Sequence, residues 1–172
     1  MKKFWICLLG ATAFAAAAVC SAETVKLGYN VGEIIAAETT TAAVEVFDRE
    51  QSPYPHKFAN PRYVVVVLKM HPRRSISSVD YSLSINGTVT PCIAAASNME
   101  PFVCNPAVLY PENKDLVRML FILDGSQLAA GDLNASLKAN LASRQDVSFK
   151  ITDLGQAKFT ESSKIPAGGM LK

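Results

Sequence analysis

The sequence predicts an all-β protein, an antiparallel β-sandwich of about seven to eight strands with at most one short helical turn. Several short segments alternate apolar and polar side chains, which is the two-residue period of a strand with one buried face. Two longer segments, residues 62–70 and 116–123, are apolar at consecutive positions, as in strands covered on both faces. Turn-forming residues separate the segments, and two sheets packed face to face accommodate both kinds of strand.

Residues 1–22 have the pattern of a secretory leader, because two lysines precede an apolar stretch (residues 4–19) and small residues come before Glu23. The stretch is too short and too rich in alanine for a retained membrane anchor. The sequence therefore predicts export to the periplasm, the cell surface or the medium. A lipoprotein acylated at Cys20 is the less favoured alternative, since Val19 stands where such leaders usually carry Gly, Ala or Ser.

Removing this leader leaves 150 residues (172 less 22), which suits one sandwich domain over residues 23–160 and a flexible C-terminal tail, residues 161–172. The whole chain has 17 basic and 15 acidic residues, and both leader charges are lysines, so the remaining domain is neutral. A neutral domain lacks the basic surface that attracts nucleic acid or anionic lipid. No later stretch is long enough to cross a bilayer as a helix.

Cys92 and Cys104 are the two cysteines that remain after the leader. An even pair in an exported chain is expected to form a disulfide. Closing a short loop stabilises the folded state by about 3 kcal/mol in the chain-entropy model. The predicted bond would hold residues 94–103 against the preceding hairpin.

The first segments after the leader differ in character. Residues 23–28 are expected to form a short strand. Residues 32–41 fit either a helical turn or, over their three threonines, extended backbone. Residues 43–47 again have the pattern of a strand.

A proline-rich loop follows over residues 48–61. Long loops inside a compact domain are often functional. This loop carries aromatic and basic side chains of the kinds found at protein and carbohydrate contacts, and the candidate binding residues are Tyr54, His56, Lys57 and Phe58. The alternative is a crossing between two sheets in which Tyr54 and Phe58 fill gaps in the core.

Residues 62–70 are rich in β-branched side chains and are the best candidate for a central strand. The basic turn that ends this strand contributes two further candidate binding residues, Arg73 and Arg74. His71 beside them is expected to be solvated, because neighbouring cations oppose the binding of a metal ion there.

Asn86 and Gly87 mark a β-hairpin between two alternating segments, residues 79–85 and 89–93. Pro91 has no N–H to donate to a ladder. The second segment is therefore expected at a sheet edge.

The register of this hairpin follows from polarity, because a shift by one residue moves every side chain to the other face. A two-residue loop would pair apolar Leu83 with Thr90, whereas a three-residue loop pairs it with Val89. The pattern favours the three-residue loop, with Gly87 left-handed in a G1 bulge. On this register Cys92 points away from the core.

Residues 94–115 contain three prolines and are expected to be an irregular excursion stapled by the cysteines. Residues 116–123 form the second strand covered on both faces. A single helical turn is expected over residues 126–131, with Ser126 as its N-cap.

Residues 133–141 alternate apolar and polar side chains without exception, which predicts a strand. A helix is the alternative, because Leu133, Leu137 and Leu141 are also four residues apart. Residues 147–152 alternate as well and are expected to pair with this strand in a hairpin.

With this strand pattern the chain resembles immunoglobulin-like sandwich domains of exported proteins, with its last three strands in a meander. The resemblance implies two antiparallel sheets around a shared core. The Cys-Trp-Cys signature of antibody domains is missing, because the single tryptophan, Trp5, lies in the leader.

The sequence contains no recognisable catalytic constellation. His56 and His71 are predicted at opposite ends of a strand, too far apart to share a metal ion. Gly125-Ser126 lacks the second glycine of a nucleophile elbow, and neither a phosphate-binding loop nor a metal-ligand motif occurs. The sequence therefore predicts no catalytic residue, no metal site and no cofactor.

We expect an exported, non-catalytic β-sandwich module that acts by contact with a protein or glycan partner. One alternative is a small periplasmic or secreted hydrolase whose site assembles from distant residues. Another is a pilin-like assembly subunit that completes its sheet with a strand from a neighbour.

Overall fold

The structure is a computed structural model that describes residues 23–27, 30–42, 44, 58–128, 133–139 and 147–160. Strands make up most of this part of the chain, and no α-helix occurs in it. The strands are β1 (Glu23–Leu27), β2 (Asn30–Thr40), β3 (Pro61–His71), β4 (Ile76–Ser77), β5 (Tyr81–Ile85), β6 (Thr88–Pro91), β7 (Ala94–Ser97), β8 (Val103–Cys104), β9 (Val108–Leu109), β10 (Leu116–Asp124), β11 (Leu133–Ala139) and β12 (Val147–Asp153).

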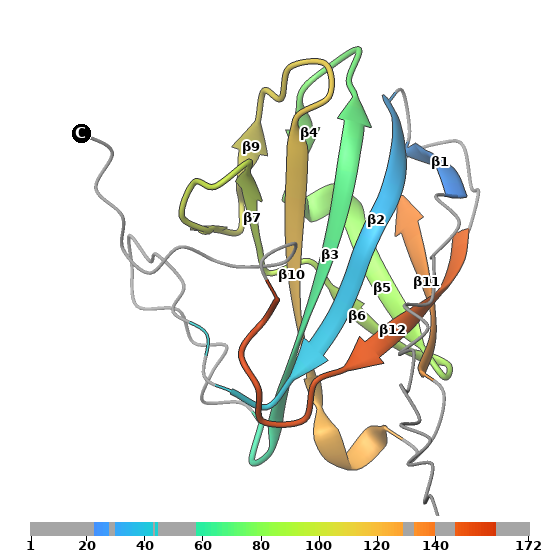
Figure 1. Cartoon of the computed structure of the whole chain (residues 1–172), viewed down its shortest axis with the longest axis vertical. Helices are drawn as coiled ribbons and strands as arrows, with labels where there is room; N and C mark the ends of the chain where they lie inside the picture. The colour runs from blue at the N-terminus through green and yellow to red at the C-terminus, as the bar shows by residue number, and fades with distance from the viewer. Residues whose placement is uncertain are drawn as a thin grey trace, which may run out of the picture.

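The strands form one curled sheet in the order β6-β5-β11-β12-β2-β3-β10-β7-β8, with β1 added beside β2. Strands β4 and β9 form a separate small sheet. The curl produces two layers, β2-β3-β10-β7 and β12-β11-β5-β6 (Figure 1). This is the strand order of immunoglobulin domains that carry an extra strand on the second sheet, so the predicted immunoglobulin-like sandwich is confirmed.

Strand β2 joins the two layers. It runs antiparallel to β3 along its length, with a register shift between Ile34 and Ala36. Near its end it also pairs with β12 in parallel, through Thr152 opposite Glu38 and Asp153 opposite Thr39. The sheet is therefore mixed, which corrects the expectation of purely antiparallel pairing.

Strands β3 and β10 are the central pair of the first layer, as predicted, and alternate residues of β3 serve two clusters. Val64 and Val66 face the second layer and belong to the main core. Val65 and Val67 belong to a second hydrophobic cluster on the opposite face, called here the outer face. Because both faces of β3 are covered, its apolar side chains are buried at consecutive positions.

Strands β5 and β11 supply the other half of the main core. Leu83 lies opposite Leu137, and both side chains are fully buried. Burying a leucine contributes about 1.5–3 kcal/mol by transfer from water. The alternation of β11 holds along the strand, so the strand prediction is confirmed and the helix alternative is wrong.

The β5–β6 hairpin has the two-residue loop, and the predicted three-residue loop is wrong. Ile85 lies opposite Thr88 and Leu83 opposite Thr90. The loop residues Asn86 and Gly87 have φ values of 47° and 87°, as a type I′ turn requires. The turn chemistry overrides the polarity pattern because the buried Thr90 hydroxyl finds an acceptor, the carbonyl oxygen of Ile122, at 2.9 Å.

Cys92 and Cys104 are not bonded to each other, contrary to the predicted disulfide. Cys104 pairs with Ala94, whose side chain belongs to the outer-face cluster. Cys92 instead lies in the main core, where its thiol donates to the carbonyl oxygen of Ala94 at 3.2 Å. The two thiols are thus held on opposite faces of the first layer, which keeps them apart.

The outward orientation predicted for Cys92 is wrong because it depended on the three-residue loop; with the two-residue loop, Thr90 and Cys92 face inward and Val89 and Pro91 face outward. The chain changes sheets directly after this residue. β6 pairs with β5 in the second layer, whereas β7 pairs with β10 in the first. At the crossing, the N–H of Cys92 donates to the carbonyl oxygen of Tyr81, and the N–H of Ile93 donates to that of Leu120. The alternation of the hairpin therefore extends to Cys92, which is buried like Thr90, while Pro91 between them is exposed.

The irregular segments also differ in detail from the predictions. The excursion predicted over residues 94–115 contains the short strands β7, β8 and β9. The helical turn predicted at residues 126–131 is a 3-10 turn, Gly125–Gln127, capped by Asp124. Of the strand predicted over residues 43–47, the structure describes only Val44, which is not in a strand.

Candidate functional site

The predicted binding residues that the structure describes lie in two different places. Tyr54, His56 and Lys57 fall outside the described residues, and Phe58, at the edge of that gap, packs half-buried against the outer-face cluster. Arg73 and Arg74 follow the other end of β3. At about 3.3 Å per residue, this strand separates its two ends by about 33 Å, so Phe58 and the two arginines do not share one site.

Arg73 and Arg74 sit on an exposed turn that Asn30 holds in place. The backbone N–H groups of both arginines donate to Oδ1 of Asn30, at 2.8 and 3.0 Å. Asn30 itself is buried. Nearby, Nδ1 of His71 lies 2.9 Å from the amide oxygen of Asn113, so the described contact of this histidine is with an amide and not with an acid.

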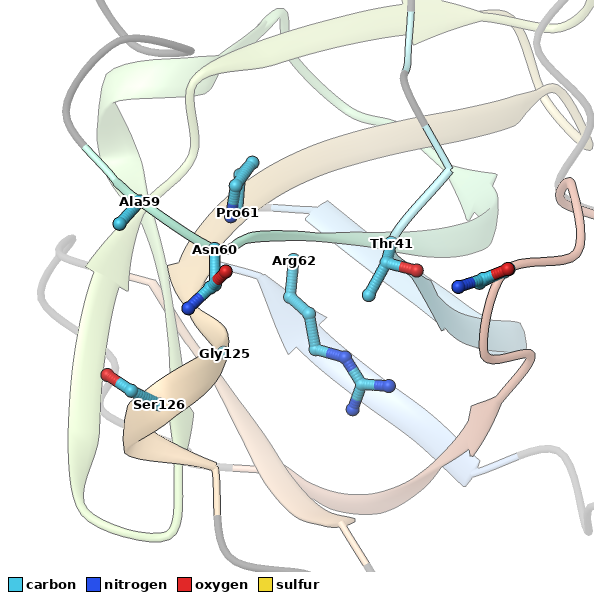
Figure 2. A pocket seen from close by; sticks show the side chains of 8 residues that line it. Thr41, Ala59, Asn60, Pro61, Arg62, Gly125 and Ser126 are labelled. Carbon is cyan, nitrogen blue, oxygen red and sulfur yellow. The ribbon is translucent and has the colours of Figure 1, made fainter.

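A pocket lies at the opposite end of the sandwich, where β2, β10 and β12 end and β3 begins. It is broad and open, with a volume of about 630 Å³. Figure 2 shows Arg62 in its centre, Asn60 and Ser126 toward one side and Thr41 on the other. This end pocket is lined by Thr41, Ala59, Asn60, Pro61, Arg62, Gly125, Ser126 and Gln156.

The wall formed by Asn60 and Gly125 depends on a close backbone approach. The N–H of Gly125 donates to the carbonyl oxygen of Asn60 at 2.8 Å. A Cβ atom at Gly125 would lie 3.1 Å from the same oxygen, which is tighter than ordinary contact. Glycine therefore lets the turn after β10 dock against the residues that precede β3.

The opposite wall is the turn after β12, and Thr40 and Thr41 hold it. The Thr40 hydroxyl donates to the carbonyl oxygens of Gly155 and Ala157, at 3.2 and 2.6 Å. The N–H of Thr41 donates to the carbonyl oxygen of Gly155 at 2.8 Å. These bonds fix the turn that carries Gln156 into the lining.

Arg62 spans the floor and is paired with Asp153. Its Nη2 lies 2.8 Å from both carboxylate oxygens of Asp153. Partial desolvation acts to raise the pKa of Asp153, but hydrogen bonds from the Gly155 N–H and from Arg62 outweigh it and hold the pKa below its usual value. The carboxylate stays ionised at neutral pH and balances the charge of the guanidinium.

Ser126 is the one lining residue with a nucleophilic side chain next to an acid. Its backbone N–H and hydroxyl both donate to Oδ1 of Asp124, at 3.0 and 2.8 Å. The hydrogen bond from the backbone, followed by that from the hydroxyl, lowers the pKa of Asp124. A carboxylate with a lowered pKa is a weak base, so this pair is the cap of a turn and not an activated nucleophile.

The end pocket therefore offers amides and hydroxyls around a neutralised ion pair, which is chemistry for hydrogen bonding to a polar partner. The sequence pointed to the proline loop, whose residues 59–61 are in the lining, but the rest of the lining comes from other chain segments and could not be identified from the sequence. Nowhere in the described ranges do three or more His, Cys, Asp or Glu side chains gather closely enough to hold a metal ion.

Among the residues that the structure describes, no helix has the length and hydropathy needed to span a bilayer. In comparisons with known proteins, no family model matches the sequence, and no curated protein and no solved structure matches it significantly. The likeness to immunoglobulin domains therefore rests on strand order, and strand order alone does not specify a function.

Proposed function

We propose that this protein is an exported, non-catalytic contact module, and that the end pocket with the adjoining proline loop is its contact surface for a protein or glycan partner. The observation that carries the proposal is the position of the end pocket in the sandwich. Residues 59–61, the last residues of the proline loop, line the pocket at one end of the sandwich. Loops at the end of a rigid sandwich are where immunoglobulin-like domains commonly bind their partners.

The chemistry of the pocket favours a neutral partner surface rich in hydrogen-bonding groups. Arg62 is held by Asp153, so the pocket presents no uncompensated charge from this pair. The remaining polar side chains are the amides of Asn60 and Gln156 and the hydroxyls of Thr41 and Ser126. Such groups match peptide main chains and sugar hydroxyls.

The two alternatives have less support. The Ser126–Asp124 pair lacks a base of suitable pKa, which weighs against a hydrolase at this site. For an assembly subunit, the place of the last strand of the sandwich is already filled by β12 of the same chain. Among the described residues, the last-strand position is therefore not empty, and a neighbour's strand could not fill it.

The contact surface is tested with an Asn60→Ala, Gln156→Ala double variant. Immobilised wild-type protein is exposed to envelope extract and, separately, to a glycan array, and the retained partner is quantified. We expect the double variant to retain at least about tenfold less, the loss that removal of two direct hydrogen bonds typically causes. Asn113→Ala is the matched control, because it removes an exposed amide at the opposite end of β3.

Equal retention by wild type and double variant would refute the assignment of the surface. Hydrolytic turnover that Ser126→Ala abolishes would refute the non-catalytic role. Export is tested separately, by the N-terminus of the protein recovered outside the cytoplasm. Cleavage before Glu23 is expected, and a chain that keeps its first 22 residues in the cytoplasm would contradict the proposal.

A further inference from the structure

Arg118 is a buried arginine whose hydrogen-bonding capacity is largely unmet. It lies on β10, opposite Val67 of β3 and Ala96 of β7, and both of these neighbours belong to the outer-face cluster. Only 1% of the residue is exposed. Its Nη2 lies 3.2 Å from the sulfur of Met99, whereas Nε and Nη1 have no hydrogen-bond partner. The acceptor that the guanidinium has is therefore a thioether, which is a weak one.

A guanidinium in this position is energetically unfavourable, because desolvation of the charge is not offset by a strong acceptor. Desolvation accordingly lowers the pKa of Arg118. A polar oxygen in place of the bare sulfur would accept hydrogen bonds from the charged group and reduce this penalty. Oxidation of a methionine adds an oxygen of this kind to the sulfur.

Met99 is held beside Arg118 by the turn that follows β7. Asn98 has a φ of 48°, and its N–H donates to the carbonyl oxygen of Leu116 at 2.6 Å. The N–H of Leu116 donates in return to Oδ1 of Asn98 at 3.0 Å. Leu116 lies on β10, two residues before Arg118. This pair of hydrogen bonds therefore fixes the turn, and with it Met99, close to the guanidinium.

Met99 is also accessible to a small oxidant. The residue is 50% exposed, whereas Met70 and Met119 are fully buried. Exposure is one of the factors that decide which sulfur in a protein is oxidised. An oxidant in the solvent should therefore reach Met99 well before it reaches Met70 or Met119.

We propose that Met99 is a site of reversible oxidation by peroxides, and that the oxygen of its sulfoxide accepts hydrogen bonds from the guanidinium of Arg118. A lone pair of the sulfur attacks one oxygen of hydrogen peroxide, the O–O bond breaks, and water leaves after a proton transfer. The sulfur loses two electrons and gains the S–O bond, and the peroxide is reduced. Methionine sulfoxide reductases restore the thioether.

The expected consequence is opposite to the usual effect of methionine oxidation, which disrupts apolar packing. Rotation about the Cγ–Sδ bond of the half-exposed Met99 side chain brings the new oxygen toward Arg118. Oxidation then stabilises the fold, because a buried cation gains a strong acceptor. The sign of the stability change thus distinguishes this site from a methionine that is merely exposed.

The test treats the full-length protein with hydrogen peroxide and maps oxidation by tryptic mass spectrometry. Met70, Met99, Met119 and Met170 fall on different tryptic peptides; Met170 is in the C-terminal tail, outside the described residues. We expect Met99 to be oxidised before Met70 and Met119, and the urea midpoint to rise by about 0.5 M. Met99→Leu keeps every other methionine and both cysteines, so it is the matched control and should show no rise.

A midpoint that stays in place or falls when Met99 is oxidised would overturn the proposal. Oxidation of Met99 no faster than that of Met70 and Met119 would overturn it too. Met99→Gln, which carries an amide oxygen near the position of the sulfoxide oxygen, should raise the midpoint without peroxide, and this gain should disappear in an Arg118→Leu background. If Arg118→Leu does not fold, Met99→Gln is compared with Met99→Leu in the otherwise wild-type chain, and equal midpoints would refute the pairing.

Discussion

Exchanging polarity at Val89 and Thr90 tests the register of the β5–β6 hairpin and, with it, which face of β6 is buried. Val89 is 58% exposed and Thr90 is 8% exposed, with its hydroxyl bonded to the carbonyl oxygen of Ile122. Thr90→Val keeps the shape and removes that bond, so it should lower the free energy of unfolding by about 1 kcal/mol. Val89→Thr changes an exposed side chain and should alter it by less than about 0.5 kcal/mol.

The assay is urea denaturation followed by circular dichroism. With an m-value of about 2 kcal/mol/M, Thr90→Val moves the midpoint by about 0.5 M, whereas Val89→Thr leaves it nearly in place. Val89 would point inward with a three-residue loop, so that register predicts the reverse order of the two effects. A larger loss for Val89→Thr than for Thr90→Val would therefore refute the register and the inward side assigned to β6.

Three further predictions follow from single contacts. Gly125→Ala should destabilise the fold by about 1 kcal/mol, measured by the same denaturation, because its Cβ would lie 3.1 Å from the carbonyl oxygen of Asn60; an unchanged midpoint would contradict this. Burial raises the pKa of the Cys92 thiol to about 12, so a thiol reagent at pH 8 should modify Cys104 but not Cys92 in the native protein. After denaturation without reductant, the reagent should modify both Cys92 and Cys104. If neither is modified after denaturation, the two cysteines form a disulfide. Asp153→Asn should lower the free energy of unfolding by about 0.5 kcal/mol at pH 7, a modest value because this carboxylate is 45% exposed. Since the pKa of Asp153 is lowered in the folded state, the difference from wild type should shrink as the pH falls below about 4. A difference that persists at pH 2 would exclude the ion pair as its cause.

The sequence was sufficient for the strands whose side-chain pattern is local. The apolar runs of β3 and β10 are buried on both faces, and the alternation of β11 matches its burial. Each of these patterns depends only on the strand itself and on which of its faces are covered. The fold class could be predicted as well, because strands buried on both faces and strands buried on one face are together accommodated by two packed layers.

Features that depend on residues distant in the sequence could not be predicted from local side-chain patterns. Polarity argued against burying Thr90, and its acceptor comes from Ile122, 32 residues further along the chain. The disulfide prediction rested on the even number of cysteines in an exported chain, which says nothing of where the side chains lie; Cys92 is in the main core, whereas Cys104 is opposite Ala94, which belongs to the outer-face cluster. The end pocket brings together four segments that are separate in sequence, so its lining emerges only when the ends of β2, β3, β10 and β12 meet.

The central claim is that the partner binds at the end of the sandwich that carries the end pocket. The most direct measurement places a photo-cross-linking amino acid at Ser126 or, in a separate variant, at Arg73 on the exposed turn at the opposite end. After irradiation of producing cells, we predict a covalent adduct to a protein or glycan partner from position 126 and none from position 73. An adduct that forms from position 73 alone would contradict the account.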